Sequence, residues 1–100
     1  MRGFGDLEAA IMTSLWSRAE PATVREVLQD LSAQRNPAYT TIMTVMTILH
    51  RKGWLHREMD GRAWRYAPVL TREEYAARLM REALDEGVDR RVRPDQLGRH

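Results

Sequence analysis

The hydrophobic pattern of this 100-residue chain changes its period at Gly53, and that change limits the folds open to it. Before Gly53, apolar residues recur three and four positions apart, as they do on one face of an α-helix. After it, residues 54–58 and 63–66 follow a period of two, which is typical of strands. Asp60-Gly61 lies between these runs and predicts a tight hairpin with a type I′ turn. A mainly helical fold with one small hairpin is therefore expected.

Three helices are expected before the hairpin. The first is capped by Asp6 and ends near Trp16. The second opens with a capping box, in which the Thr23 hydroxyl accepts from the Glu26 amide. The third runs over about residues 38–52, and the glycine that follows it is a natural left-handed cap.

A fourth helix is expected after the hairpin. Thr71 and Glu74 form a second capping box, and the apolar pattern continues to about Glu86 or Gly87. Three helices, a hairpin and a further helix make up the order of a winged helix-turn-helix, in which Thr23 or a neighbour can supply a short first strand. The predicted division is a winged-helix DNA-binding domain at 5–69, a C-terminal helix at 70–88 that starts a dimerisation region, and a flexible tail at 89–100.

Composition excludes several classes of protein. With 43% hydrophobic and 30% charged residues, the chain is typical of a globular domain rather than a disordered one. It contains no cysteine, which excludes disulfides, thiol chemistry and cysteine-based zinc sites. No apolar run is long enough to cross a bilayer, and the N-terminus lacks the apolar core of a signal peptide. We expect a cytoplasmic protein without membrane insertion.

The charge of the chain is unevenly distributed. The net charge is +2, but residues 1–34 sum to −2, residues 35–66 to +4 and residues 67–100 to zero. A localised positive region is the electrostatic footprint of a nucleic-acid binder. The middle third, which holds the third helix and the hairpin, is therefore the candidate binding region.

The predicted third helix has two different faces. At about 100° per residue, one stripe is apolar and predicts the core side; it consists of Ile42, Val45, Met46 and Leu49. The opposite face carries no acid and consists of Thr40, Thr44, Thr47 and Arg51, with Thr41 beside it. Threonine is a poor helix former, so four of them among eight residues favour a binding face over simple solvent exposure. Such a face suits the major groove, where threonine can contact phosphates, base edges and thymine methyl groups.

The hairpin adds cations to this candidate surface. Arg57, Arg62 and Arg65 lie on it or at its tip, where a wing could follow a phosphate track. The alternative is that these charges only protect an exposed strand edge from aggregation. Thr23 and Arg25, at the start of the second helix, complete the predicted DNA-binding set with Arg62, Arg65 and the third-helix residues.

The sequence favours neither catalysis nor a bound cofactor. His50 and His56 are not accompanied by acids or cysteines at metal-ligand spacing, so no metal site and no catalytic residue are expected. The aromatic residues Trp54, Trp64 and Tyr66 are expected to pack in the core or against the hairpin rather than to stack on bases.

Several segments resemble the penicillinase-repressor family of winged-helix regulators. The similar segments are residues 38–44 with Leu49 and residues 51–53 for the recognition helix, residues 5–8, 11–12 and 15–16 for the first helix, and residues 61–68 for the wing. The resemblance implies a repressor that binds an inverted-repeat operator in double-stranded DNA as a homodimer. It also implies control of β-lactam resistance or cell-wall stress genes, with a membrane-receptor protease pathway that leads to repressor cleavage.

In that family the dimer is made by C-terminal helices. The pairing residues predicted here are on the fourth helix: Tyr75, Leu79, Met80, Ala83 and Leu84. The alternative function is a winged helix that binds another protein and ignores DNA. A small-molecule sensor is a third possibility, for which the sequence marks no pocket.

Overall fold

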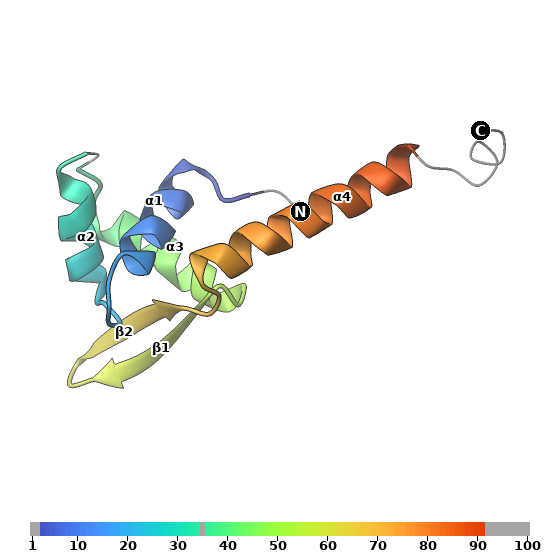
Figure 1. Cartoon of the computed structure of the whole chain (residues 1–100). Helices are drawn as coiled ribbons and strands as arrows, with labels where there is room; N and C mark the ends of the chain where they lie inside the picture. Colours follow the sequence, from blue (N-terminus) through green and yellow to red (C-terminus); the bar gives the residue numbers. More distant parts are fainter. Residues whose placement is uncertain (1–2, 35, 92–100) are drawn as a thin grey trace, which may run out of the picture. The chain divides into compact units, whose positions relative to one another are not determined.

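Three helices precede a two-stranded hairpin in the computed structural model, and a fourth helix follows it (Figure 1). The structure describes residues 3–34 and 36–91, with side chains up to residue 85. The elements are α1 (Asp6–Trp16), α2 (Val24–Ser32), α3 (Tyr39–Arg51), β1 (Leu55–Asp60), β2 (Ala63–Pro68) and α4 (Arg72–Arg91). One compact unit spans Phe4–Thr71, and α4 belongs to a second unit.

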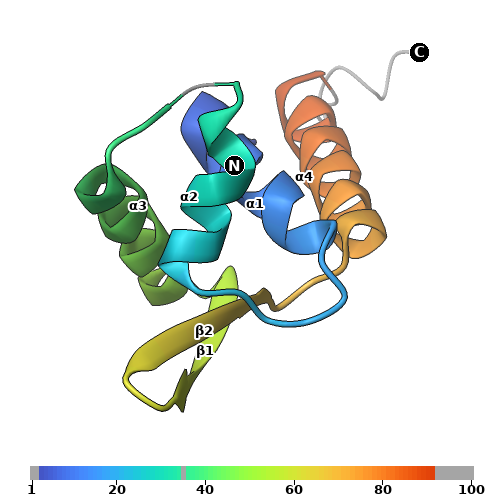
Figure 2. The same ribbon diagram turned by 90° about the vertical axis from the view of Figure 1, so that its left-hand side faces the viewer.

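The first three helices and the hairpin share a single hydrophobic core (Figure 2). Its largest fully buried side chains are Ile11, Met12, Val27, Ile42, Met46, Leu49 and Leu55. The apolar stripe predicted on the third helix is confirmed, because three of its members are buried and Val45 is partly buried against them. The opposite face of α3 is therefore turned away from the core.

The two N-terminal helices begin in different ways. At α2 the predicted capping box is present: the Glu26 N–H donates to Thr23 Oγ1 at 3.1 Å, and the Thr23 N–H donates to Glu26 Oε1 at 3.0 Å. At α1 the predicted Asp6 cap is wrong, because Gly5 takes that position and its N–H donates to Glu8 Oε1 at 3.0 Å. Asp6 lies instead in the first turn, where a carboxylate still favours the helix dipole.

The hairpin forms the wing and is anchored to the helical part of its unit. Its register leaves Gly61 and Arg62 as a two-residue loop between paired Asp60 and Ala63. Gly61 has a φ of +65° and Arg62 has no positive φ, so the turn has the φ pattern of type II′ rather than the predicted type I′. A short antiparallel bridge joins Ala22 to Tyr66, with N–O distances of 2.9 and 2.8 Å. The expected first strand is thus the neighbour of Thr23.

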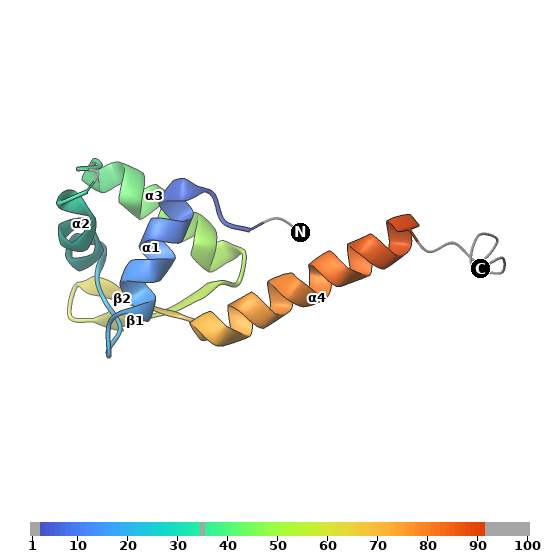
Figure 3. The same ribbon diagram turned by 45° about the horizontal axis from the view of Figure 1, so that its top comes forward.

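The fourth helix is longer than the sequence predicts. It continues without a break through Gly87 to Arg91 (Figure 3), so residues 89–91, predicted to begin a flexible tail, are helical. One interior glycine costs a helix only about 1 kcal/mol relative to alanine, which does not by itself end it. The rest of the predicted tail, residues 92–100, lies outside the described residues.

The side chains predicted to pair two copies differ in exposure. Tyr75 is buried and Leu79 is half-buried, whereas Met80, Ala83 and Leu84 are exposed. None of the helices in the described part of the chain is both long and apolar enough to cross a membrane.

Candidate nucleic-acid interface

The outward face of α3 is accessible and carries no acid. Thr40, Thr41 and Thr44 are exposed, as is Arg51 in the last turn. Within the described residues, these four side chains have no hydrogen-bond or ion-pair partner. Thr47 is half-buried, and its hydroxyl donates to the Met43 carbonyl oxygen at 2.8 Å. Three threonines and one arginine are thus free to bind a ligand, and Thr47 presents mainly its methyl group.

The two predicted arginines of the wing have different surroundings. Arg62 is exposed in the turn and has no carboxylate partner among the described side chains. Arg65 is half-buried; its Nε lies 2.6 Å from Asp60 Oδ2, and its Nη1 lies 3.1 Å from Glu26 Oε1. Nη1 also donates to the Pro21 carbonyl oxygen at 3.2 Å. Arg65 therefore ties the wing to the start of α2, and a direct DNA contact by it stays a prediction.

The contacts between the wing and the start of α2 favour the charged forms of Arg65 and Glu26. The bond with Asp60, followed by the charge of Glu26, raises the pKa of Arg65. The backbone N–H of Thr23 chiefly lowers the pKa of Glu26, and Arg65 lowers it further. The capping box and the wing contact thus depend on one ionised carboxylate.

The predicted residues at the start of α2 lie next to α3. Thr23 is half-buried and its hydroxyl oxygen caps α2, which leaves its O–H free to donate outward. Arg25 is exposed, and its guanidinium lies 5.5 Å from the centre of the Tyr39 ring. The structure therefore brings the start of α2 and the start of α3 to the same surface.

A cleft of about 400 Å³ lies between the start of α2, the first turns of α3 and the wing. No acid lines it; the lining residues are Thr23, Val24, Arg25, Tyr39, Met43, Arg62, Ala63, Trp64 and Tyr66. We call it the aromatic cleft. It brings together predicted DNA-binding residues from two segments of the chain, Thr23 and Arg25 at the start of α2 and Arg62 in the wing.

The three aromatics predicted to pack in the core or against the hairpin differ in their burial. Tyr66 is buried and Trp54 is partly buried against the core, but Trp64 is 40% exposed. Trp64 pairs with Met59 near the wing tip, beyond the part of the hairpin that reaches the core. The alternating pattern identifies the face of the strand, and it does not show where along that face the core ends.

Arg57 was expected among the cations of the wing, but its contacts with the hairpin aromatics were not predicted. Its guanidinium lies 4.2 Å from the centre of the Trp64 ring and 5.9 Å from that of Tyr66, and Nη1 donates to the Tyr66 hydroxyl at 3.3 Å. The signal that could have found this group is the spacing of two along each strand, which places these three side chains on one face. Tyr39 and Met43, at 40% and 41% exposed, were also missed.

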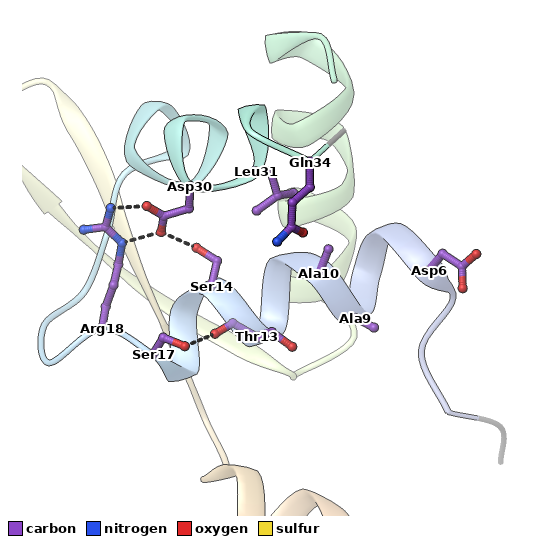
Figure 4. Close-up of a pocket in the computed structure, with 10 residues that line it drawn as sticks. All are labelled: Asp6, Ala9, Ala10, Thr13, Ser14, Ser17, Arg18, Asp30, Leu31 and Gln34. Atoms are coloured by element: carbon purple, nitrogen blue, oxygen red, sulfur yellow. Dashed lines mark hydrogen bonds and ion pairs between the residues drawn. The ribbon is translucent and has the colours of Figure 1, made fainter. Parts of the chain in front are cut away.

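A second hollow, of about 720 Å³, lies between α1 and α2 (Figure 4). Three of its polar side chains bind one another: Ser14 Oγ donates to Asp30 Oδ2 at 2.6 Å, and Arg18 Nε and Nη2 contact the two Asp30 oxygens at 2.9 and 3.0 Å. Arg18 chiefly lowers the pKa of Asp30, and Ser14 lowers it further. These contacts join α1 to α2, so we assign this hollow a structural role.

Three helices, a short strand at Ala22 and a hairpin wing define a winged helix-turn-helix. Comparison with known proteins makes the assignment more specific. Residues 4–94 match the model of the penicillinase repressor family, and the chain belongs to that family.

Two kinds of relative support this membership. Transcriptional regulator BlaI of Mycobacterium tuberculosis, from strains CDC 1551 / Oshkosh and ATCC 25618 / H37Rv, is 53% identical over 85 residues. That match covers 85% of this chain and 62% of the relative, so the chain spans less than two thirds of the length of these regulators.

The fold is also similar to two solution structures. One is the DNA-binding domain of the repressor BlaI, with a TM-score of 0.63 and 27% identity over 75% of this chain and 94% of that one. The other is the monomeric form of Bacillus licheniformis BlaI in complex with the blaP half-operator, with a TM-score of 0.61 and 27% identity, covering 74% of this chain and 89% of that one.

Proposed function

We propose that this chain is a sequence-specific transcriptional repressor that binds operator DNA in the cytoplasm. The observation that carries the proposal is the exposed, acid-free threonine face of α3. An α-helix fits the major groove, and a face without carboxylates avoids repulsion by the phosphates on either side. The family assignment supports the proposal, as does the half-operator bound to the Bacillus licheniformis repressor.

Each proposed contact has a distinct chemical task. Thr40, Thr41 and Thr44 offer hydroxyl groups to base edges or phosphates, and Thr47 offers its methyl group to a thymine methyl. Arg25, Arg51 and Arg62 neutralise phosphates, and the Thr23 hydroxyl at the start of α2 donates a hydrogen bond to a phosphate oxygen. Arg65 serves mainly to hold the wing in place, because three groups of the same domain already accept its hydrogen bonds.

We also propose that two copies bind the two halves of an inverted repeat. Met80 and Leu84 stand four residues apart on α4, and each is 65% exposed. Exposed apolar side chains at this spacing form a row on one helix face, which a second helix can cover. Pairing through Tyr75, Leu79, Met80, Ala83 and Leu84 would set the distance between the two recognition helices.

The family also guides the proposal for the regulated genes. We infer that they serve β-lactam resistance or the response to cell-wall stress, and that induction proceeds through a membrane-receptor protease pathway that cleaves the repressor. Both inferences rest on the family alone.

Fluorescence anisotropy with two labelled duplexes tests the function. One duplex carries a family-type inverted repeat and the other the same bases in scrambled order. We expect tighter binding to the repeat and a linear fall of log affinity with log salt, with a slope of about −0.9 per neutralised phosphate. Equal affinity for both duplexes would remove sequence specificity, and no binding at low salt would favour a protein-binding winged helix instead. Light scattering of the chain alone and with the repeat duplex tests the pairing.

A further inference from the structure

The aromatic cleft has a composition that the threonine face does not explain. Three large side chains with apolar surface, Tyr39, Met43 and Trp64, are each about 40% exposed, and all three line this one hollow. Two further lining residues, Arg25 and Arg62, are cationic, and no lining residue is acidic. A ligand that suits this lining carries a negative charge and also has an apolar part.

The Trp64 ring is already held on one side. Arg57 lies 4.2 Å from its centre and donates a hydrogen bond to the Tyr66 hydroxyl, which is part of a buried residue. A guanidinium over an aromatic ring is attracted by the negative face of the ring. The arrangement leaves the ring free to meet a ligand only on the surface that Arg57 does not cover.

The position of the cleft narrows the choice of ligand. It opens between the first turns of α3 and the wing tip, beside the helix that we propose to enter the major groove. The walls of a DNA groove are sugar–phosphate backbone, whose bases remain stacked inside the duplex. A deoxyribose presents C–H groups for apolar packing, and the adjoining phosphate presents the negative charge.

We propose that the aromatic cleft seats one deoxyribose–phosphate unit of the operator backbone. Trp64 and Met43 pack against the sugar, Arg25 and Arg62 neutralise the phosphate, and Arg57 is a positioning residue that holds the Trp64 ring. This inference rests on the proposed function, because it requires that α3 and the wing bind duplex DNA. It assigns to the packing of Trp64 and Met43 against the sugar a part of the affinity that depends neither on salt nor on sequence.

The packing of Trp64 against a sugar should depend neither on salt nor on sequence, for two physical reasons. Neutralising a phosphate releases counterions and therefore adds to the salt slope. Packing of Trp64 against a sugar removes apolar surface from water and releases no ions, so its loss lowers affinity equally at every salt concentration. A deoxyribose is the same for all four nucleotides, so its loss also leaves sequence preference unchanged.

The experiment compares the full chain with its Trp64→Ala, Trp64→Phe and Arg62→Gln variants. Affinity for the inverted-repeat duplex and for a duplex with altered bases is measured by anisotropy at four salt concentrations. We expect Trp64→Ala to lose about five- to tenfold on both duplexes with an unchanged salt slope, and Trp64→Phe to retain most of the affinity. Arg62→Gln should instead reduce the slope by about one.

Tryptophan fluorescence gives a second readout that does not depend on affinity. Trp16 donates its ring N–H to the Leu70 carbonyl oxygen at 2.9 Å, and Trp54 packs against Phe4 and the core. DNA should therefore change the emission of the unaltered chain through Trp64, and this change should be absent in Trp64→Phe. Circular dichroism establishes whether each variant is folded. If Trp64→Ala does not fold, the emission of Trp64→Phe provides the test.

The outcomes separate this inference from the proposed function. If the unaltered chain binds no duplex, the proposed function fails and this inference fails with it. If the chain binds DNA while both Trp64 variants keep full affinity and the emission change, the seat in the aromatic cleft is wrong and the proposed function stands. A changed sequence preference in Trp64→Ala would also overturn the inference, because it would show that this ring contacts bases.

Discussion

The arginines that line the two hollows of the winged-helix unit differ in their partners. In the hollow between α1 and α2, Arg18 contacts both oxygens of Asp30, so these two charges already neutralise each other. In the aromatic cleft, Arg25 lies over a tyrosine ring and Arg62 has no carboxylate partner in the described part of the chain. Two regions of one small domain thus hold arginines that do different work. An arginine paired within the protein stabilises the fold, and one without an anion is available to bind one.

Arg65 combines features of both groups. It lies on the wing, as a DNA-binding arginine should, but it contacts Asp60 and Glu26, as a structural arginine does. Charge counting along the sequence gives it the same weight as Arg62. Only the positions of the two carboxylates distinguish them.

The largest expected effect comes from changing the proposed DNA-binding face of α3. Thr44→Glu places a carboxylate on the acid-free face of α3, where it would meet phosphate oxygens. Like charges brought together at an interface cost several kcal/mol, so we expect operator affinity to fall by roughly 100-fold or more. Anisotropy with the inverted-repeat duplex measures the loss.

A matched control lies in the hollow between α1 and α2, to which we assign a structural role. Thr13 is also an exposed helical threonine, but it lines the hollow between α1 and α2. Thr13→Glu adds the same charge and should leave operator affinity within about twofold. If Thr44→Glu bound the operator as tightly as Thr13→Glu, α3 would not be in the interface.

The next effect concerns Arg62, the exposed arginine in the turn of the wing. Arg62→Ala removes one phosphate contact, so affinity for every sequence should weaken about equally and the salt slope should fall by about one unit. Arg18→Gln also removes one positive charge, but that charge is already neutralised by Asp30, and the slope should not change. A changed base preference in Arg62→Ala would mean that the wing reads bases rather than backbone.

Arg65→Gln tests whether Arg65 stabilises the fold, as Arg18 does, or binds a phosphate, as we propose for Arg62. If Arg65 mainly positions the wing, the salt slope should fall by less than in Arg62→Ala, and the variant should unfold at a lower urea concentration than the parent. Urea unfolding followed by circular dichroism and anisotropy at several salt concentrations measure both. A full unit of lost slope with unchanged stability would make Arg65 a direct phosphate contact.

Periodicity and capping chemistry predicted most of the fold because they act over short stretches of chain. The threonine face of α3 and the α2 capping box depend on residues within a few turns of one another. The Asp-Gly signal located the hairpin, but the turn type depends on which two residues form the loop, and cross-strand pairing decides that. The end of α4 was missed because a single glycine is a weak stop signal.

The candidate site was less predictable, because its composition depends on contacts between distant segments. Arg65 meets Glu26, and Trp64 lines a hollow with Met43, only once the wing has folded beside α2 and α3. Neither spacing within the strands nor net charge contains that information. The sequence therefore predicts the DNA-binding cations only as a group and does not separate those that are already paired within the protein.

The smallest effect is expected from weakening the ion pair between Arg18 and Asp30. Asp30→Asn removes the charge that Arg18 binds, and since both side chains are about one third exposed we expect a loss of about 1 kcal/mol of stability at neutral pH. Because folding lowers the pKa of Asp30, its stabilisation is present above the ordinary value of 3.8 and is lost as the pH falls through the lower folded value. The stability difference between variant and parent should therefore shrink in acid. Urea unfolding at neutral and acidic pH measures it, with Glu20→Gln, an exposed carboxylate outside these contacts, as the control. A difference that stays constant with pH would show that the Arg18–Asp30 contact does not stabilise the fold through its charge.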